Sequence, residues 1–215
     1  QKILKIQEVL KKFSIIVPKC AHLLLKENGQ KNLKFKAKFI YLISPININA
    51  KFFNKLESVL KSNKVYYFQL RLKKTPEHKI ISYSIKIKKI CKKYKVKFII
   101  NDNPRIAKKV AADGCHIGQS DTNVSETRKI LRNKIIGVTC HNSKKLAKKA
   151  IKDGADYVAI GAFNISKTKR TKYKAGLSDL IKIRKISNKP IVAIGGINQK
   201  NYKKLLLNKA DFLAI

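Results

Sequence analysis

Short runs of β-branched and aromatic residues alternate along this chain with longer segments in which apolar residues recur at helical spacing. The alternation begins near residue 38 and continues to the last residue. Apolar runs without a polar residue at every second position are typical of parallel strands that are buried on both faces. Strict alternation of strands and helices favours a parallel sheet, because each helix returns the chain to the end of the sheet at which the previous strand began.

We predict eight strands, over residues 39–44, 65–72, 96–102, 114–118, 134–140, 155–163, 190–196 and 210–215. The seven helices between them are predicted over residues 49–63, 76–94, 104–112, 125–133, 143–154, 178–187 and 199–209. Eight such units favour a TIM (β/α)8 barrel of the α/β class. A doubly wound open sheet is the alternative, but no G-x-G-x-x-G turn follows the first strand.

The segment before the barrel has a different character. Residues 1–38 are rich in lysine and carry apolar residues at helical spacing: Ile3, Ile6, Val9, Leu10 and Phe13. They predict an N-terminal helical extension, followed by a barrel domain over residues 39–215. The sequence ends at Ile215 without the helix that would follow the eighth strand, and it contains no Met. We therefore expect it to be part of a longer chain.

The charge balance is extreme, with 50 Lys and Arg against 12 Asp and Glu and a net charge of +38. The positive electrostatic potential of such a protein attracts polyanions, so nucleic-acid binding is one interpretation of the charge. The other is a bias in residue usage that spreads lysine over every solvated helix face. We favour the bias, because the lysines are dispersed and no basic motif interleaved with aromatic residues is present. Small phosphorylated substrates are then the expected partners, and nucleic acid is not.

The cysteines indicate the compartment. Cys20, Cys91, Cys115 and Cys140 form no CxxC pair and no spacing typical of a metal site. Two of them lie in apolar strand-like runs, where a buried reduced thiol is the usual state. No apolar run reaches the length of about 18 residues that a membrane span needs, and the first residues carry no targeting pattern. We therefore expect a protein of the reducing cytoplasm, without a membrane partner.

Polar side chains gather where the predicted strands end, which is the functional rim of a TIM barrel. Asp102 follows the third strand and Asp121 lies just past the fourth. Neighbouring strands are about 5 Å apart, so the two carboxylates can share a hard divalent ion such as Mg²⁺, together with substrate phosphate oxygens. No comparable gathering is expected at the opposite rim.

The same rim carries groups suited to phosphate. Arg71, Lys73 and Lys169 supply positive charge, and an arginine can bind phosphate bidentately. We expect Gln69, Arg71 and Lys73 to share one face of the second strand, because they alternate along it. Gly195 and Gly196 close the seventh strand, where a phosphate could approach backbone N–H groups. Further polar candidates are Asn101, Gln119, Thr139, Ser166 and Thr168. Together these residues predict a site for a diphosphate and a second phosphate.

Two histidines lie near this rim. His116 follows the alternation of the fourth strand, and we interpret it as a hydrogen-bonded core residue rather than a catalytic one. His141 follows Thr139 and could touch a ligand.

Five segments of the chain resemble the thiamine-phosphate synthase family: FQLRLK (68–73), INDNPRIAKKVAADGCHIGQSD (100–121), IIGVTCHN (135–142), GADYVAIGAFNISKTK (154–169) and PIVAIGGI (190–197). They occur in the order of the family. The resemblance implies a TIM barrel that joins 4-amino-2-methyl-5-hydroxymethylpyrimidine diphosphate to thiazole phosphate. The products would be thiamine phosphate and pyrophosphate.

The resemblance also implies roles for single residues. Asp102 and Asp121 would bind Mg²⁺. The pyrimidine diphosphate would be held by Gln69, Arg71, Lys73 and Asn101. Thr139, where the family usually has Ser, would lie near the reacting centre, and Lys169 would contact the leaving diphosphate. The thiazole phosphate would be bound by Ser166, Thr168, Gly195 and Gly196. Among these residues, the catalytic ones would be Arg71, Thr139 and Lys169.

Two other functions stay open at this point. A thiazole tautomerase shares the barrel but needs no metal-bound diphosphate, and the presence of both Asp102 and Asp121 favours the synthase. A basic, non-catalytic barrel that binds nucleic acid is the second alternative. The chain departs from the family at Leu72, where an acid is usual, and at Ala162, where Pro usually follows glycine. Nothing in the sequence indicates the oligomeric state.

Overall fold

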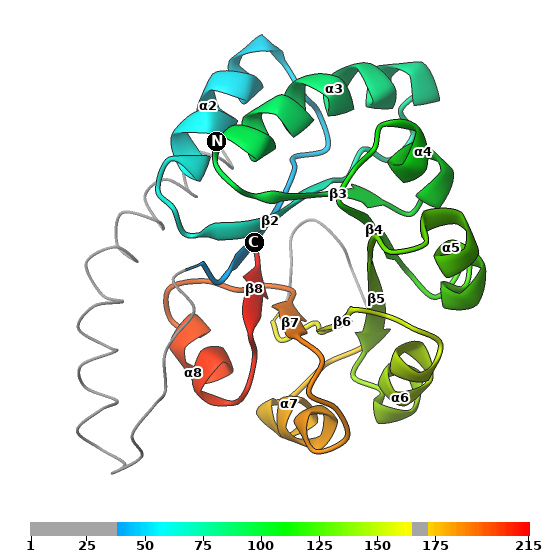
Figure 1. The fold of residues 1–215 in the computed structure, drawn as a ribbon. Coiled ribbons are helices and arrows are strands. Elements are labelled where there is room, and N and C mark those ends of the chain that lie inside the picture. The colour runs from blue at the N-terminus through cyan, green and yellow to red at the C-terminus, as the bar shows by residue number, and fades with distance from the viewer. Residues whose placement is uncertain (1–37, 165–171) are drawn as a thin grey trace.

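The computed structural model describes residues 38–164 and 172–215. Within them, eight parallel strands close into a barrel in chain order (Figure 1). The strands are β1 (Ile40–Ile43), β2 (Val65–Leu70), β3 (Lys97–Asn101), β4 (Gly114–Ile117), β5 (Ile135–His141), β6 (Tyr157–Ile160), β7 (Ile191–Ile194) and β8 (Phe212–Ala214). The barrel closes because β1 pairs with both β2 and β8. The predicted TIM barrel is confirmed.

The described residues form seven helices, which lie outside the ring of strands (Figure 1). They are α2 (Ala50–Leu60), α3 (Glu77–Lys93), α4 (Pro104–Lys109), α5 (Val124–Leu131), α6 (Lys144–Lys152), α7 (Leu177–Arg184) and α8 (Tyr202–Leu207). Each corresponds to a predicted helix. Of the predicted extension over residues 1–38, all but Lys38 lies outside the described residues. In the described part of the chain, no helix is both long and apolar enough to cross a membrane.

The strands are apolar on both faces because they separate two cores. Outward-facing residues such as Leu42, Phe68 and Ile100 pack against the helices. The interior of the barrel holds a second, smaller cluster that includes the side chains of Tyr41, Tyr67, Ile99, Tyr157, Val192 and Phe212. Burial on both sides explains why the strands appear in the sequence as continuous apolar runs.

The interior cluster is dominated by aromatic rings. The Tyr157 ring centroid lies 5.7 Å from that of Tyr41 and 5.4 Å from that of Tyr67, and all three side chains are buried. Gly137 on β5 makes room for this ring, because a Cβ atom there would lie 1.8 Å from Tyr157 Cζ. A glycine inside a strand is therefore required here by the close approach of a neighbouring ring.

The rim at the amino-terminal ends of the strands differs from our expectation, because it holds its own set of acids. Three aspartates precede the even strands β4, β6 and β8, respectively Asp113, Asp156 and Asp211. Each accepts a hydrogen bond from a backbone N–H near the start of the preceding strand, at 2.9, 2.8 and 2.8 Å. Each also pairs with a basic side chain, respectively Lys97, Arg128 and Arg184. We call these three groups the rim staples.

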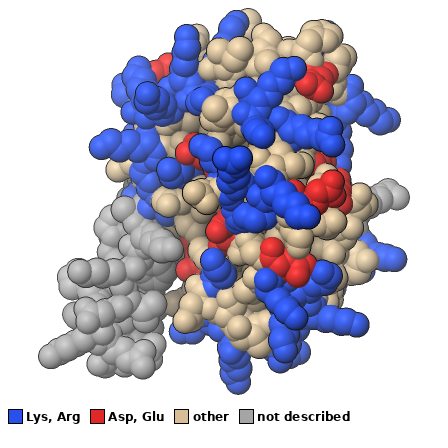
Figure 2. Space-filling view, turned by 45° about the vertical axis from the view of Figure 1, so that its right-hand side comes forward, with Lys and Arg blue, Asp and Glu red and all other residues tan. Residues whose placement is uncertain are grey.

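The surface charge is dispersed. Figure 2 shows Lys and Arg side chains spread across the visible face, with few acidic side chains between them. On this face the distribution fits a bias in residue usage rather than a single basic groove.

Candidate active site

β3 and β4 bring two carboxylates together at the carboxyl-terminal rim of the barrel. Asp102 follows β3, with φ of 63° and its N–H donating to the carbonyl of His116 at 2.7 Å. Asp121 lies in the turn after β4, where its Oδ2 accepts from Gly118 N at 2.7 Å. Burial raises the pKa of the Asp121 carboxyl, and the neighbouring Asp102 raises it further. The two acids therefore face each other, as their places in the sequence predict.

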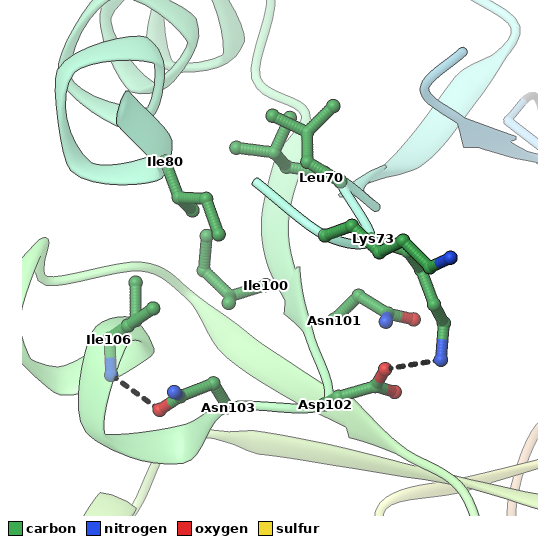
Figure 3. A pocket seen from close by; sticks show the side chains of 10 residues that line it. Leu70, Lys73, Ile80, Ile100, Asn101, Asp102, Asn103 and Ile106 are labelled. Atoms are coloured by element: carbon green, nitrogen blue, oxygen red, sulfur yellow. Dashed lines mark hydrogen bonds and ion pairs between the residues drawn. The ribbon is translucent and has the colours of Figure 1, made fainter. Parts of the chain in front are cut away.

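Lys73 lies across from this pair. Its Nζ is 3.0 Å from Asp102 Oδ2, and its side chain is 56% exposed (Figure 3). An ion pair so open to solvent contributes little to folding. β2 ends at Leu70, so Arg71 and Lys73 belong to the loop that follows and not to the strand. That loop is held by Ser44, whose Oγ accepts from Arg71 N at 2.9 Å.

Gln69 is the last polar residue inside β2, and its side chain is buried. It pairs in register with Ile43 of β1 and Ile99 of β3. Its Nε2 has no hydrogen-bond partner among the described residues. A buried donor without an acceptor costs about 1–3 kcal/mol. Such a group one residue below the rim is suited to a ligand that brings an acceptor atom.

Thr139 is held from two sides. Its Oγ1 lies 2.8 Å from His116 Nε2, and its carbonyl accepts from Gln119 Nε2 at 2.5 Å. The register between β5 and β6 shifts between Thr139 and His141, and such bulges often re-aim side chains next to active sites. His116 is buried and hydrogen-bonded, as its position in the strand predicts. The ring of His141 stacks on Tyr173, with 3.9 Å between the centroids.

The glycine pair after β7 is conformationally required. Gly195 and Gly196 have φ of 95° and 62°. A Cβ atom at Gly196 would lie 2.6 Å from Asn164 Cβ, so a side chain has no room there. Ser166, Thr168 and Lys169, which we predict to bind phosphate, lie outside the described residues.

A cavity of about 240 Å³ opens beside Asp102 (Figure 3). Lys73, Asn101 and Asp102 form its polar side. Its apolar side is formed by Leu70, Ile80, Ile100 and Ile106. The sequence pattern does not predict this cavity, because these apolar side chains follow the ordinary core pattern of strands and helices.

Few side chains of the described residues at this rim could ligate a divalent cation. Among the described residues, no cluster of three or more His, Cys, Asp or Glu could ligate a metal. The candidate site therefore consists of two carboxylates, those of Asp102 and Asp121. Such a site suits Mg²⁺, which keeps several waters and binds through one or two carboxylates and substrate phosphates.

Comparisons with known proteins give the family. The model of the family described as thiamine monophosphate synthase matches residues 40–215. A thiamine-phosphate synthase of Pelagibacter ubique is 60% identical over 186 residues, which cover 86% of this chain and 90% of the relative. One from Erythrobacter litoralis is 39% identical over 82% of this chain and 85% of the relative.

A solved structure supports the same assignment. The thiamine phosphate pyrophosphorylase from Pyrococcus furiosus superimposes with a TM-score of 0.74 and 28% identity, covering 86% of this chain and 87% of that one. The match of the family model and the high identity to the relatives agree with the residues gathered at the rim. The chain belongs to the thiamine monophosphate synthase family.

Proposed function

We propose that this chain joins 4-amino-2-methyl-5-hydroxymethylpyrimidine diphosphate to thiazole phosphate, giving thiamine phosphate and pyrophosphate. Membership of the family supports the reaction. The observation that carries the proposal is the pair of carboxylates at the barrel mouth, where the pKa of Asp121 is raised. A tautomerase has no use for such a pair, whereas a diphosphate substrate arrives with a divalent cation.

Asp102 and Asp121 would hold Mg²⁺. Two carboxylates that oppose each other's ionisation suit a cation that offsets their repulsion. When bound, Mg²⁺ neutralises negative charge that develops on the departing pyrophosphate. If Asp102 holds Mg²⁺, Lys73 would lose its present partner, and its ammonium would be free to bind a phosphate oxygen. Substrate binding can thus replace the Lys73–Asp102 ion pair by a Lys73–phosphate contact.

The chain's own residues bind and orient the two substrates. Gln69, Asn101 and Thr139 are assigned to the pyrimidine, and its diphosphate to Arg71, Lys73 and Lys169. The thiazole phosphate is assigned to Ser166, Thr168, Gly195 and Gly196. The thiazole nitrogen forms a bond to the methylene carbon of the pyrimidine, and the C–O bond to the diphosphate breaks. The electron pair of the broken C–O bond leaves with pyrophosphate, so no protein nucleophile is needed.

The proposed location is the cytoplasm. The three described cysteines are buried and free, and burial raises the pKa of the Cys140 thiol to about 12. Buried reduced thiols suit a reducing compartment.

The reaction is tested by incubating the purified protein with both substrates and measuring thiamine phosphate by chromatography. We expect product with Mg²⁺ and a rate at least about 100-fold lower with excess EDTA. Equal rates with and without EDTA would contradict the metal site. Isomerisation of a thiazole phosphate without condensation would favour the tautomerase. Salt-dependent retention on DNA without any product would favour the nucleic-acid-binding barrel.

Asp121→Asn is expected to stabilise the metal-free protein, because it removes a carboxylate that is costly to ionise. Asparagine can still accept the hydrogen bond from Gly118. Because Asp121 is only partly buried, solvent screens this effect, and the expected rise in Tm is at most about 2–4 °C. Because the folded-state pKa of Asp121 is raised, its contribution to wild-type stability is lost as pH rises through that pKa. The Tm advantage of the variant should therefore grow from the ordinary carboxyl range, near pH 4, upward.

Thermal unfolding in EDTA across this pH range measures the effect. Adding Mg²⁺ should stabilise the wild type and not the variant. A variant that is less stable than the wild type at neutral pH would contradict the repulsion between the two carboxylates.

A further inference from the structure

A chain of hydrogen bonds runs from the interior of the barrel to its mouth through Tyr41, Tyr157, His116 and Thr139. The Tyr41 and Tyr157 hydroxyls are 2.7 Å apart. The Tyr157 hydroxyl lies 2.9 Å from His116 Nδ1, and His116 Nε2 lies 2.8 Å from Thr139 Oγ1. Tyr41, Tyr157 and His116 are buried, and Thr139 is half-buried at the end of β5. None of these contacts is needed to explain the closed barrel, whose strands are already paired.

The protons in this chain can be arranged in two directions. A neutral imidazole has one donor nitrogen and one acceptor nitrogen. If Thr139 donates to His116, the chain runs inward, and the Tyr41 hydroxyl hydrogen is left at the buried end. If Tyr41 donates to Tyr157, the chain runs outward, and the Thr139 hydroxyl hydrogen is left at the mouth. The hydrogen-bonding partners of the buried Tyr41 hydroxyl decide which of the two directions is favoured.

Within the described residues, the Tyr41 hydroxyl has one hydrogen-bond partner, Tyr157. An inward chain would leave the Tyr41 hydrogen without an acceptor in the apolar interior, which is costly. An outward chain pairs every buried hydrogen: Tyr41 donates to Tyr157, Tyr157 donates to His116 Nδ1, and His116 Nε2–H donates to Thr139. The outward direction is therefore preferred.

We propose that His116 is a positioning residue that turns the Thr139 hydroxyl into a hydrogen-bond donor aimed at the pyrimidine substrate. Because Thr139 Oγ1 accepts from His116, its own hydrogen is directed to an acceptor atom of the substrate. Gln119 fixes the backbone of the same residue through the Thr139 carbonyl. The inference rests on the proposed function, since it assumes that the pyrimidine lies beside Thr139.

The tautomer of His116 tests the chain directly and needs no substrate. In protein labelled with ¹⁵N-histidine, the ring shifts distinguish Nε2–H from Nδ1–H. The chain has four histidines, and His116→Gln assigns the signal. We expect the Nε2–H form in the wild type and a lower share of it in Tyr157→Phe, which can no longer donate to Nδ1. A wild-type protein in the Nδ1–H form overturns the proposal.

Steady-state kinetics of variants test whether this hydrogen-bond chain contributes to catalysis. Tyr157→Phe should lower kcat about tenfold, as expected for one misdirected hydrogen bond in the transition state. Tyr41→Phe should cost about twofold at most, because Tyr157 can still donate to His116. Tyr67→Phe makes the same chemical change in the same interior cluster and serves as the matched control. It should leave kcat unaltered.

Coupling to Thr139 separates positioning from a structural role. Thr139→Val should lower kcat, and Thr139→Ser should restore it. In the Thr139→Val background, Tyr157→Phe should cause no further loss of kcat, whereas its effect on Tm should persist. Additive losses of kcat would overturn the proposal while leaving the proposed reaction intact. A wild-type protein that makes no thiamine phosphate would instead contradict the proposed function, and the tautomer measurement would still decide the hydrogen-bond chain.

Discussion

Replacing Asp102 with asparagine is expected to abolish magnesium-dependent synthesis of thiamine phosphate, with kcat reduced by about 10³-fold. The substitution removes one of the two carboxylates, and Asp121 alone is a poor site for a divalent cation. Asparagine is preferred to alanine because position 102 has φ of 63°. Asparagine tolerates this left-handed conformation, whereas alanine adds strain of about 1 kcal/mol.

The measurement is the initial rate as a function of Mg²⁺ concentration, with thermal unfolding to show that the variant is folded. Asp153→Asn is a matched control, because it removes an aspartate paired with Lys149 at the end of α6, away from the mouth of the barrel. The control should keep wild-type kinetics. Turnover within a few-fold of the wild type in Asp102→Asn would remove the metal from the proposed mechanism.

Alanine at Gly137 is expected to destabilise the barrel by about 3 kcal/mol, the upper range for overpacking a core. The added methyl would lie 1.8 Å from Cζ and 2.2 Å from Oη of Tyr157. The Tyr157 ring is enclosed by Tyr41 and Tyr67 and cannot move aside. β5 is equally fixed, since it pairs with both β4 and β6. The Tm should fall by roughly 10 °C.

Thermal and urea unfolding would measure this loss. Gly176→Ala is the control, because a Cβ atom there meets nothing closer than Ser178 Oγ at 3.7 Å. Combining Gly137→Ala with Tyr157→Leu should cost less than the sum of the two single changes, since the smaller side chain leaves room for the methyl. An unchanged Tm in Gly137→Ala would show that the ring can be displaced easily.

The fold could be predicted because a parallel strand buried on both faces has a distinctive pattern. The same geometry predicted that Asp102 and Asp121 would meet, since consecutive parallel strands end at one rim. The loop position of Arg71 and Lys73 was not predictable from alternation, because no glycine or proline separates them from β2. Ser44 terminates the strand instead, by accepting the Arg71 N–H.

The polar contacts within the barrel were harder to predict. Tyr41, Tyr157 and His116 stand in apolar runs, and a sequence does not distinguish a linked hydroxyl from an ordinary core ring. The acids of the amino-terminal rim were missed for a related reason. Each follows or precedes small residues, as in AADG and GADY, and therefore has the appearance of an ordinary turn residue.

The rim staples divide the barrel into modules. The backbone hydrogen bond of each staple joins two consecutive strands, respectively β3 to β4, β5 to β6 and β7 to β8. One longer contact crosses between these pairs, because Lys189 Nζ, just before β7, lies 4.0 Å from Asp156 Oδ1. A break in the chain between β4 and α5, or between β6 and α7, would separate no staple aspartate from its backbone N–H donor or from Lys97, Arg128 or Arg184. The smallest unit of this barrel that contains a complete staple, with its hydrogen bond and its ion pair, is thus built on a pair of strands and not on a single strand with its helix. Three of the 12 acids of the sequence lie in these staples, at the rim opposite to the proposed active site.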